Sequence, residues 1–201
     1  MSRTTIREAL KLLQEKRLIR VRQGLGTTVL PEDEWDLLDP VVLAATVRND
    51  GELGVLDQLV DVRRALEGQM AQQTALRATP ADLGPIRDAF EQLVEEVHTP
   101  EVFVQSDVRF HEAIMFASGN RLARAIVRTV HGEALRSVRY TGAPTTESCA
   151  AANEGHRQVL DCLEAGDGEG AATAMSDHIL DGWLRRRPTR TPHPDHASTA
   201  S

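Results

Sequence analysis

Residues 53–82 read LGVLDQLVDVRRALEGQMAQQTALRATPAD, and this stretch decides the class of fold. Its apolar residues recur at the spacing of one helix face, as Leu56, Leu59, Leu66 and Met70 show. The segment ATPAD at residues 78–82 then interrupts the pattern for only a few residues. A helix over about 53–77 with so short a break after it predicts an antiparallel neighbour.

The remainder of the chain repeats this alternation of long helical patterns and short breaks. We expect helices over about 81–97, 101–117, 121–139, 146–165 and 168–186, separated by HTP, SGN, TGAPTTES and AGDG. Apolar residues make up 41% of the chain and aromatic residues 3%, a composition typical of helical proteins with a core. The sequence therefore predicts an all-α fold built around an antiparallel helical bundle.

Charge is distributed unevenly along the chain. Residues 1–30 contain seven Lys or Arg against two Asp or Glu, whereas the rest contains sixteen against twenty-eight. A basic segment of net charge +5 on a body of net charge −12 indicates an element that binds a polyanion. Chance clustering on a solvated helix face is the alternative.

No membrane or secretory segment is predicted. No stretch approaches about 18 consecutive apolar residues, and the N-terminus lacks the apolar region of a signal peptide. Cys149 and Cys162 lack the spacing of a disulfide framework, so we expect them to be reduced. These features predict a cytoplasmic protein without a membrane partner.

The first thirty residues predict a helix followed by a hairpin. Thr4 or Thr5 is the expected cap of a helix that extends to about residue 16. The segment LIRVRQGLGTTVL, residues 18–30, alternates apolar and polar residues around Gly24 and Gly26, which is a strong hairpin signal. The major groove of DNA admits such a helix, and arginine can bind a guanine edge through two hydrogen bonds.

Residues 2–29, SRTTIREALKLLQEKRLIRVRQGLGTTV, resemble the GntR family of winged helix-turn-helix repressors. The resemblance rests on S-R-x-x-[IV]-R-E-A-L, a short turn, and a hairpin that ends G-x-G-T. It implies a recognition helix plus a β-hairpin wing, with exposed side chains on a solvated helix as the alternative. The residues that it implies for DNA binding are Ser2, Arg3, Thr4, Arg7, Gln23 and Gly24.

The family's winged domain has two further helices before this one, which the sequence does not contain. We therefore expect a partial winged helix-turn-helix, which is either N-terminally truncated or belongs to a protein that has lost its DNA-binding domain. Without those helices Ile6, Leu10, Leu13 and Ile19 are expected to lack their usual partners.

One carboxylate and three imidazoles are spaced so that they can meet inside the bundle. Asp107 and His111 are four residues apart on one helix face, and His156 and His178 lie in the middle of two further helices. Such a ligand set suits Zn²⁺ in particular, or Ni²⁺ or Mn²⁺, with coordination positions left for water or an acid. An Asp–His hydrogen bond and ordinary core histidines are the alternative.

The spacing D-x3-H, then His after 45 and after a further 22 residues, resembles the FCD ligand-binding domain of the FadR subfamily within GntR. LLDPVVL (37–43), VDVRRALE (60–67) and FHEAIMFASGN (110–120) match that subfamily too. The resemblance implies a divalent ion on Asp107, His111, His156 and His178 that holds a small carboxylate effector.

Three more residues receive an expected place within this bundle. Arg63 matches a position from which an arginine can clamp the effector carboxylate, and a salt bridge with Glu67 one turn later is the alternative. Asn120 is expected to cap a helix, and His131 is an outside candidate for the pocket wall.

The chain is therefore interpreted as four segments: a partial winged domain (1–31), a linker with a short helix that begins near Pro40 (32–52), an FCD-like bundle (53–187) and a disordered tail (188–201). We expect a metabolite-responsive regulator, acting as a homodimeric repressor on operator DNA, and not an enzyme. The effector is expected to be a small carboxylate such as a hydroxyacid or a sugar acid. A sensor made of the FCD domain alone, without DNA binding, is the first alternative, and a metal-dependent hydrolase is the second.

Overall fold

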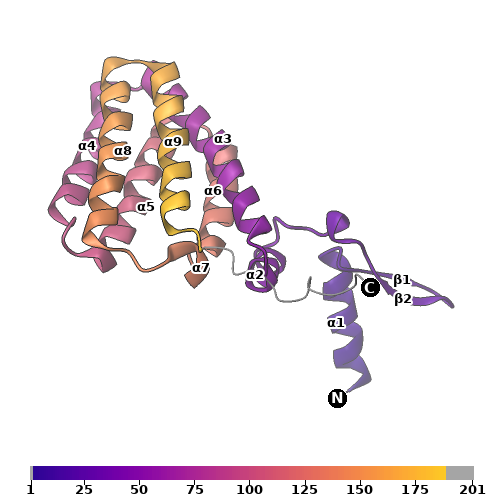
Figure 1. Ribbon diagram of the computed structural model, residues 1–201. Coiled ribbons are helices and arrows are strands. Elements are labelled where there is room, and N and C mark those ends of the chain that lie inside the picture. The colour runs from indigo at the N-terminus through magenta and orange to yellow at the C-terminus, as the bar shows by residue number, and fades with distance from the viewer. Residues whose placement is uncertain (1, 189–201) are drawn as a thin grey trace, which may run out of the picture.

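The structure, a computed structural model, describes residues 2–188 and is helical apart from one hairpin (Figure 1). This confirms the predicted all-α class with a small two-stranded wing. The predicted tail lies, from residue 189 onward, outside the described residues. The elements are α1 (Arg3–Glu15), β1 (Ile19–Arg22), β2 (Gly26–Val29), the 3-10 helix η1 (Glu32–Glu34), α2 (Pro40–Asn49), α3 (Gly54–Arg77), α4 (Pro80–Glu95), α5 (Pro100–Ala117), α6 (Arg121–Ala134), α7 (Val138–Thr141), α8 (Thr146–Ala165) and α9 (Gly168–Arg186).

Helix α3 is the central element of the bundle. It packs along α9 and also contacts α5, α6 and α8, while α4 lies against α5 and α8 (Figure 1). The core where these helices meet contains side chains that are almost fully buried, among them Leu56, Phe110, Ile114, Val159 and Met175. Burial of this apolar surface is the main favourable contribution to the stability of the bundle.

Local sequence decides where most of these helices begin. Thr79 and Asp82 form a capping box at the start of α4, in which each side chain accepts a hydrogen bond from the other residue's backbone amide. Asn120 Oδ1 accepts a hydrogen bond from the amide of Ala123 at 3.1 Å, so the predicted cap of α6 is confirmed. Helix α2 begins at Pro40, as predicted.

The predicted cap of the first helix is wrong. Helix α1 begins at Arg3, and Ser2 rather than Thr4 or Thr5 is its N-terminal cap. Ser2 has an extended backbone (φ −79°, ψ 153°), and its Oγ accepts a hydrogen bond from the amide of Thr5 at 3.2 Å. Thr4 and Thr5 lie inside the first turn, where the backbone is already helical.

The predicted helix over 121–139 is also wrong, because it is divided in two. Helix α6 ends at Ala134, and the short α7 follows after an extended Ser137. This break allows Tyr140 to turn inward, where it is 1% exposed and its ring stacks on Trp183 at a centroid distance of 5.6 Å. Tertiary burial of one aromatic side chain therefore overrides the local helical pattern.

The hairpin pairs Ile19 with Val29 and Arg22 with Gly26 in antiparallel register. Gly24 and Gly26 have φ of +77° and +91°, a conformation that favours glycine, and they turn the chain between the strands. Ile19 is only 7% exposed, so the expectation that it lacks a partner is wrong.

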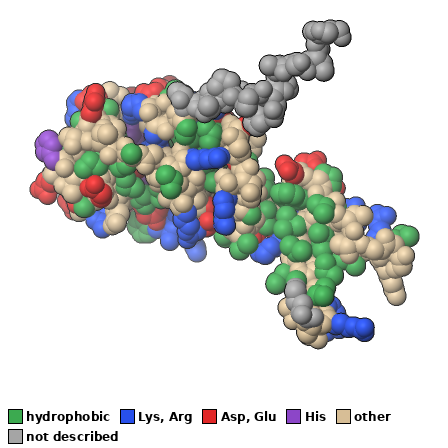
Figure 2. All heavy atoms as spheres, turned by 60° about the horizontal axis from the view of Figure 1, so that its bottom comes forward, with side chains coloured by type: hydrophobic (Ala, Val, Ile, Leu, Met, Phe, Trp, Pro, Cys, Tyr) green, Lys and Arg blue, Asp and Glu red, His purple; other side chains and the backbone are tan. Residues whose placement is uncertain are grey.

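Helix α1, in contrast, has no buried residue within the described chain. Ile6 and Leu13 remain 46% and 38% exposed, and Figure 2 shows hydrophobic side chains gathered over this N-terminal part. A largely apolar groove of about 840 Å³ lies between α1 and α2. Among residues 2–188, no helix is both long and apolar enough to span a bilayer.

Candidate metal centre

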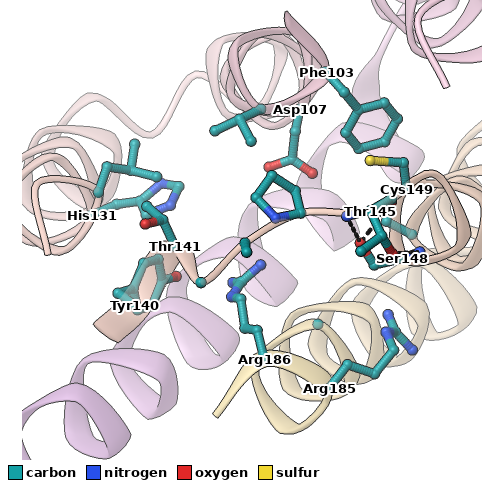
Figure 3. A pocket seen from close by; sticks show the side chains of 17 residues that line it. Phe103, Asp107, His131, Tyr140, Thr141, Thr145, Ser148, Cys149, Arg185 and Arg186 are labelled. Atoms are coloured by element: carbon teal, nitrogen blue, oxygen red, sulfur yellow. Dashed lines mark hydrogen bonds between the residues drawn. The ribbon is translucent and has the colours of Figure 1, made fainter. Parts of the chain in front are cut away.

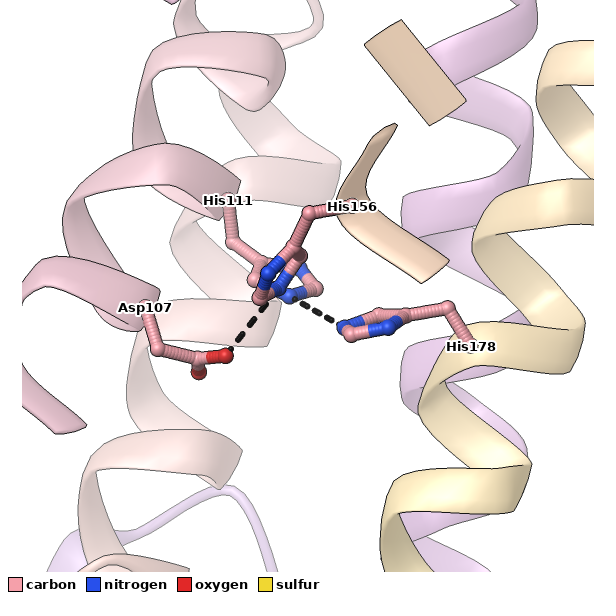
Figure 4. Close-up of side chains that lie close together, drawn as sticks. All are labelled: Asp107, His111, His156 and His178. Atoms are coloured by element: carbon pink, nitrogen blue, oxygen red, sulfur yellow. Dashed lines mark hydrogen bonds and ion pairs between the residues drawn. The ribbon is translucent and has the colours of Figure 1, made fainter. Parts of the chain in front are cut away.

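The four predicted metal ligands converge inside the bundle (Figure 4). Asp107 and His111 come from α5, His156 from α8 and His178 from α9. One ligand atom from each residue lies within 4.8 Å of the others. The three histidines are buried, and Asp107 is partly exposed. The structure thus brings all four side chains to one point, which is what the spacing in the sequence predicts.

The distances within the cluster suit a shared ion. His156 Nε2 lies 3.1 Å from Asp107 Oδ1, and His111 Nε2 lies 3.2 Å from His178 Nε2. Two ligand atoms bound about 2.1 Å from one ion, at the angles of tetrahedral or octahedral coordination, are roughly 3.0–3.4 Å apart. Both pairs fall within that range.

Two imidazole nitrogens of the cluster lack a hydrogen-bond partner. Within residues 2–188, His156 Nε2 and His178 Nδ1 are buried without one. His156 Nε2 lies near Asp107, but the geometry is not that of a hydrogen bond. A buried polar atom without a partner costs about 1–3 kcal/mol. A cation bound between Asp107 and His156 would give His156 Nε2 a partner, so the donor set fits a metal ion.

Burial sets the charge of the cluster. It lowers the pKa of both His156 and His178, and the positive form of neighbouring histidines lowers the pKa of His178 further. Burial by itself raises the pKa of Asp107, but the close contact with His156 and the electrostatic attraction of the facing imidazoles outweigh it and hold that pKa well below its usual value. Asp107 is therefore ionised while His156 and His178 are neutral, the protonation state that metal ligands require.

Glu67 on α3 orients the ring of His111. Its Oε2 lies 2.6 Å from His111 Nδ1, and because an ionised carboxylate only accepts, Nδ1 carries the ring proton. The lone pair of His111 is therefore on Nε2, the atom that faces the cluster. Carboxylates commonly support metal-binding histidines in this way. From the sequence, Glu67 is expected only as a partner of Arg63, since no spacing along the chain connects it to His111.

Arg63 forms the salt bridge that was the alternative to an effector clamp. Its Nε lies 2.5 Å from Glu67 Oε1, and its Nη1 contacts the Tyr140 hydroxyl at 2.6 Å and His131 Nε2 at 3.1 Å. Arginine has only donors, so His131 Nε2 accepts and Nδ1 carries the proton. With its guanidinium engaged in this way and only 3% of the residue exposed, Arg63 does not line the cavity described next.

A cavity of about 390 Å³ adjoins the cluster on the side of Asp107 (Figure 3). Asp107 therefore belongs both to the ligand cluster and to the cavity wall. His131, the outside candidate from the sequence, also lines it. The remaining wall comes from α5, the segment between α6 and α8, the first turns of α8 and the C-terminal end of α9. It includes Phe103, Tyr140, Thr141, Thr145, Ser148, Cys149, Arg185 and Arg186.

The residues predicted to bind DNA lie far from this centre, at the other end of the molecule (Figure 1). They are exposed and occupy two places, the first turns of α1 and the turn of the hairpin. Arg7 Nε lies 3.8 Å from a carboxylate oxygen of Glu8. These predicted residues are Ser2, Arg3, Thr4, Arg7, Gln23 and Gly24.

Comparisons with known proteins identify the family. The FCD domain family matches residues 58–181. The galactonate operon transcriptional repressor of Escherichia coli is 27% identical over 184 residues, covering 92% of this chain and 80% of that protein. The putative L-lactate dehydrogenase operon regulatory protein of E. coli is 32% identical over 186 residues (89% and 70%). The HTH-type transcriptional regulator LutR of Bacillus subtilis is 30% identical over 183 residues (89% and 82%).

Solved structures show the same fold. A GntR protein of Streptococcus agalactiae matches with a TM-score of 0.57 and 23% identity, covering 92% of this chain and 83% of that one. McbR/YncC of E. coli matches with a TM-score of 0.57 and 19% identity (92% and 80%). The relatives are transcriptional regulators rather than enzymes, so nothing in the comparisons favours the hydrolase alternative. The chain belongs to the GntR/FadR-type transcriptional regulators that carry an FCD domain.

Proposed function

We propose that this regulator senses a small organic acid through a divalent ion bound by Asp107, His111, His156 and His178. Zn²⁺ is the preferred ion, and Ni²⁺ or Mn²⁺ also suits the donor set. The convergence of the four ligand atoms within 4.8 Å is the observation that carries this proposal. The unpartnered His156 Nε2 and the cavity beside Asp107 support it.

The side chains around the centre have separate tasks. Glu67 holds the ring of His111 with its Nε2 toward the cluster, and Arg63 holds Glu67 in place. The bound ion would supply an electrophilic site for a carboxylate that enters the cavity. Names of the relatives refer to a galactonate operon and an L-lactate dehydrogenase operon, which favours a hydroxyacid or sugar acid as the effector.

The wall of the cavity is connected to the linker helix α2. Tyr140 lines the cavity from α7, and the preceding Arg139 donates a hydrogen bond to the backbone oxygen of Asp50 at 2.5 Å. The Asp50 carboxylate in turn accepts from the first amides of α3, including that of Val55 at 2.8 Å. Because Asp50 directly follows α2, movement of α7 on acid binding would reach α2 and the N-terminal elements.

Regulation then takes place in a dimer bound to operator DNA in the cytoplasm. The acid changes DNA affinity only if it binds two arrangements of the dimer with different affinity. The exposed Arg3 and Arg7 on α1, and Gln23 on the hairpin, are the proposed DNA contacts. The repressor named among the relatives favours repression as the output.

Metal analysis of the purified protein tests the proposal. We expect about one divalent ion per chain, and His156→Ala should lose most of it, since loss of a ligand commonly costs at least about 10–100-fold in affinity. His98→Ala is the matched control, because His98 is exposed and outside the cluster. If the protein contains no ion and Zn²⁺ or Ni²⁺ leaves its melting temperature unchanged, the metal centre is refuted.

A further inference from the structure

The cavity beside Asp107 has a second charged end. Arg185 and Arg186, in the last turn of α9, line it together with Thr145 and Ser148 at the start of α8. Figure 3 shows Arg186 and Asp107 on opposite sides of the cavity. The cavity therefore extends from the proposed ion to a pair of guanidinium groups.

Arg186 is held by packing, and no carboxylate among residues 2–188 forms a salt bridge with it. Its guanidinium carbon lies 4.8 Å from the centre of the Tyr140 ring. Its Nε is buried and has no hydrogen-bond partner within residues 2–188. The positive charge of the next residue, Arg187, is in contrast neutralised by a carboxylate. Its Nε and Nη2 both donate to the Asp57 carboxylate, at 2.9 and 2.7 Å.

The start of α8 adds positive potential at the same end of the cavity. Helix α8 is twenty residues long, and the partial positive charge of its N-terminus favours an anion nearby. The amides of Thr145 and Ser148 already donate to each other's hydroxyl groups in a capping box. Helix α8 therefore contributes positive electrostatic potential to the cavity but no free amide from Thr145 or Ser148. The donor that lacks an acceptor at this end is the buried Nε of Arg186.

We infer that the effector is a hydroxy dicarboxylic acid, one end of which reaches the ion beside Asp107 while the second carboxylate binds Arg186. This inference rests on the proposed function, because it assumes that the ion holds the first end. Arginine binds carboxylates through charge-assisted hydrogen bonds, and a second carboxylate supplies the acceptor that Arg186 Nε lacks. A monoacid bound to the ion would leave that donor without an acceptor.

Two pairs of acids that differ at one end test the inference on the zinc-loaded protein. L-Malate is compared with L-lactate, and galactarate with galactonate, by calorimetry and by the shift of the melting temperature. We expect the diacid of each pair to bind about 10–100-fold more tightly, which is the range for a hydrogen bond to a charged group.

Variants of Arg186 assign this preference to one side chain. Arg186→Gln should weaken the diacids to the level of the monoacids without loss of zinc, and Arg186→Lys should restore part of the preference. Arg77→Gln is the matched control, because Arg77 lies in the last turn of α3 and does not line the cavity. It should leave all four affinities unchanged.

Two results would overturn the inference and leave the proposed function intact. One is equal affinity of the wild-type protein for diacid and monoacid, a comparison that requires no variant to fold. The other is an unchanged preference for the diacids in Arg186→Gln. Absence of both zinc and acid binding in the wild-type protein would refute the proposed function together with this inference.

Discussion

Replacement of Gly155 by alanine tests whether His178 depends on the close approach of α8 and α9. Gly155 lies in α8, one residue before His156, and a Cβ added there would be 2.5 Å from His178 Nδ1 and 3.2 Å from its Cβ. Ordinary contacts of this kind are about 3.4–4 Å, so the His178 ring would have to move by roughly 1 Å.

Two opposing effects determine the stability of this variant. Alanine favours a helix interior over glycine by about 1 kcal/mol. Overpacking a core costs about 1–3 kcal/mol, so the metal-free protein should lose up to about 2 kcal/mol of unfolding free energy. The effect on metal is larger, because metal–ligand distances tolerate only about 0.2 Å of deviation. We expect at least about a tenfold loss of metal affinity.

Metal titrations followed by calorimetry, and urea unfolding with and without Zn²⁺, measure both effects. Gly132→Ala in α6 is the matched control, because a Cβ there meets nothing within 4 Å. It should stabilise the helix and leave metal affinity unchanged. Wild-type metal affinity in Gly155→Ala would refute the reasoning, because the clash would then be relieved without moving His178 away from the ion.

Four further predictions concern other parts of the molecule. Glu67→Gln should lower metal affinity about 10–100-fold, measured by titration, because the amide orients His111 less well than the carboxylate. Burial, and then a neighbouring arginine, lower the pKa of His131 well below 6.5, so the unfolded chain binds a proton that the folded chain rejects. Stability should therefore be complete above about pH 6.5 and fall below it, and His131→Gln should flatten this dependence in urea unfolding. Arg139→Ala should preserve metal and acid binding but reduce the effect of the acid on DNA affinity in gel-shift titrations. Because α1 buries no residue within 2–188, the affinity of this chain for DNA should be weak and should fall steeply with salt. Arg7→Ala should reduce the slope of log affinity against log salt concentration by about one, and an unchanged slope would argue against a phosphate contact.

Helix positions could be predicted from the sequence because they depend on local signals. Apolar spacing and caps such as Thr79 and Asn120 act within one or two turns, so the predicted bundle helices agree with the structure to within two residues except at the end of α6. That exception follows from Tyr140, whose burial against Trp183 depends on a helix far away in the sequence. The predicted segment boundaries at 31, 52 and 187 stay predictions.

The identity of the candidate ligands could also be predicted, whereas the roles of their neighbours could not. Asp107, His111, His156 and His178 are the residue types that bind metal, placed where a bundle can gather them. No pattern in the sequence decides whether the Arg63 side chain faces the cavity or pairs with Glu67. Nor does any pattern show that Arg186 lines the cavity. These outcomes depend on the rotation and packing of whole helices.

The sequence by itself determined the all-α class, the starts of the bundle helices and the four residues that can form a metal centre, because periodicity, capping and ligand chemistry are properties of short segments. Only the tertiary structure decided that Glu67 sets the proton on His111, that Arg63 is engaged within the core, and that Arg186 has an unpartnered donor at the cavity. Each of these facts depends on atoms from helices that are distant in the chain, and only the packing of α3, α5 and α9 around one core determines their distances.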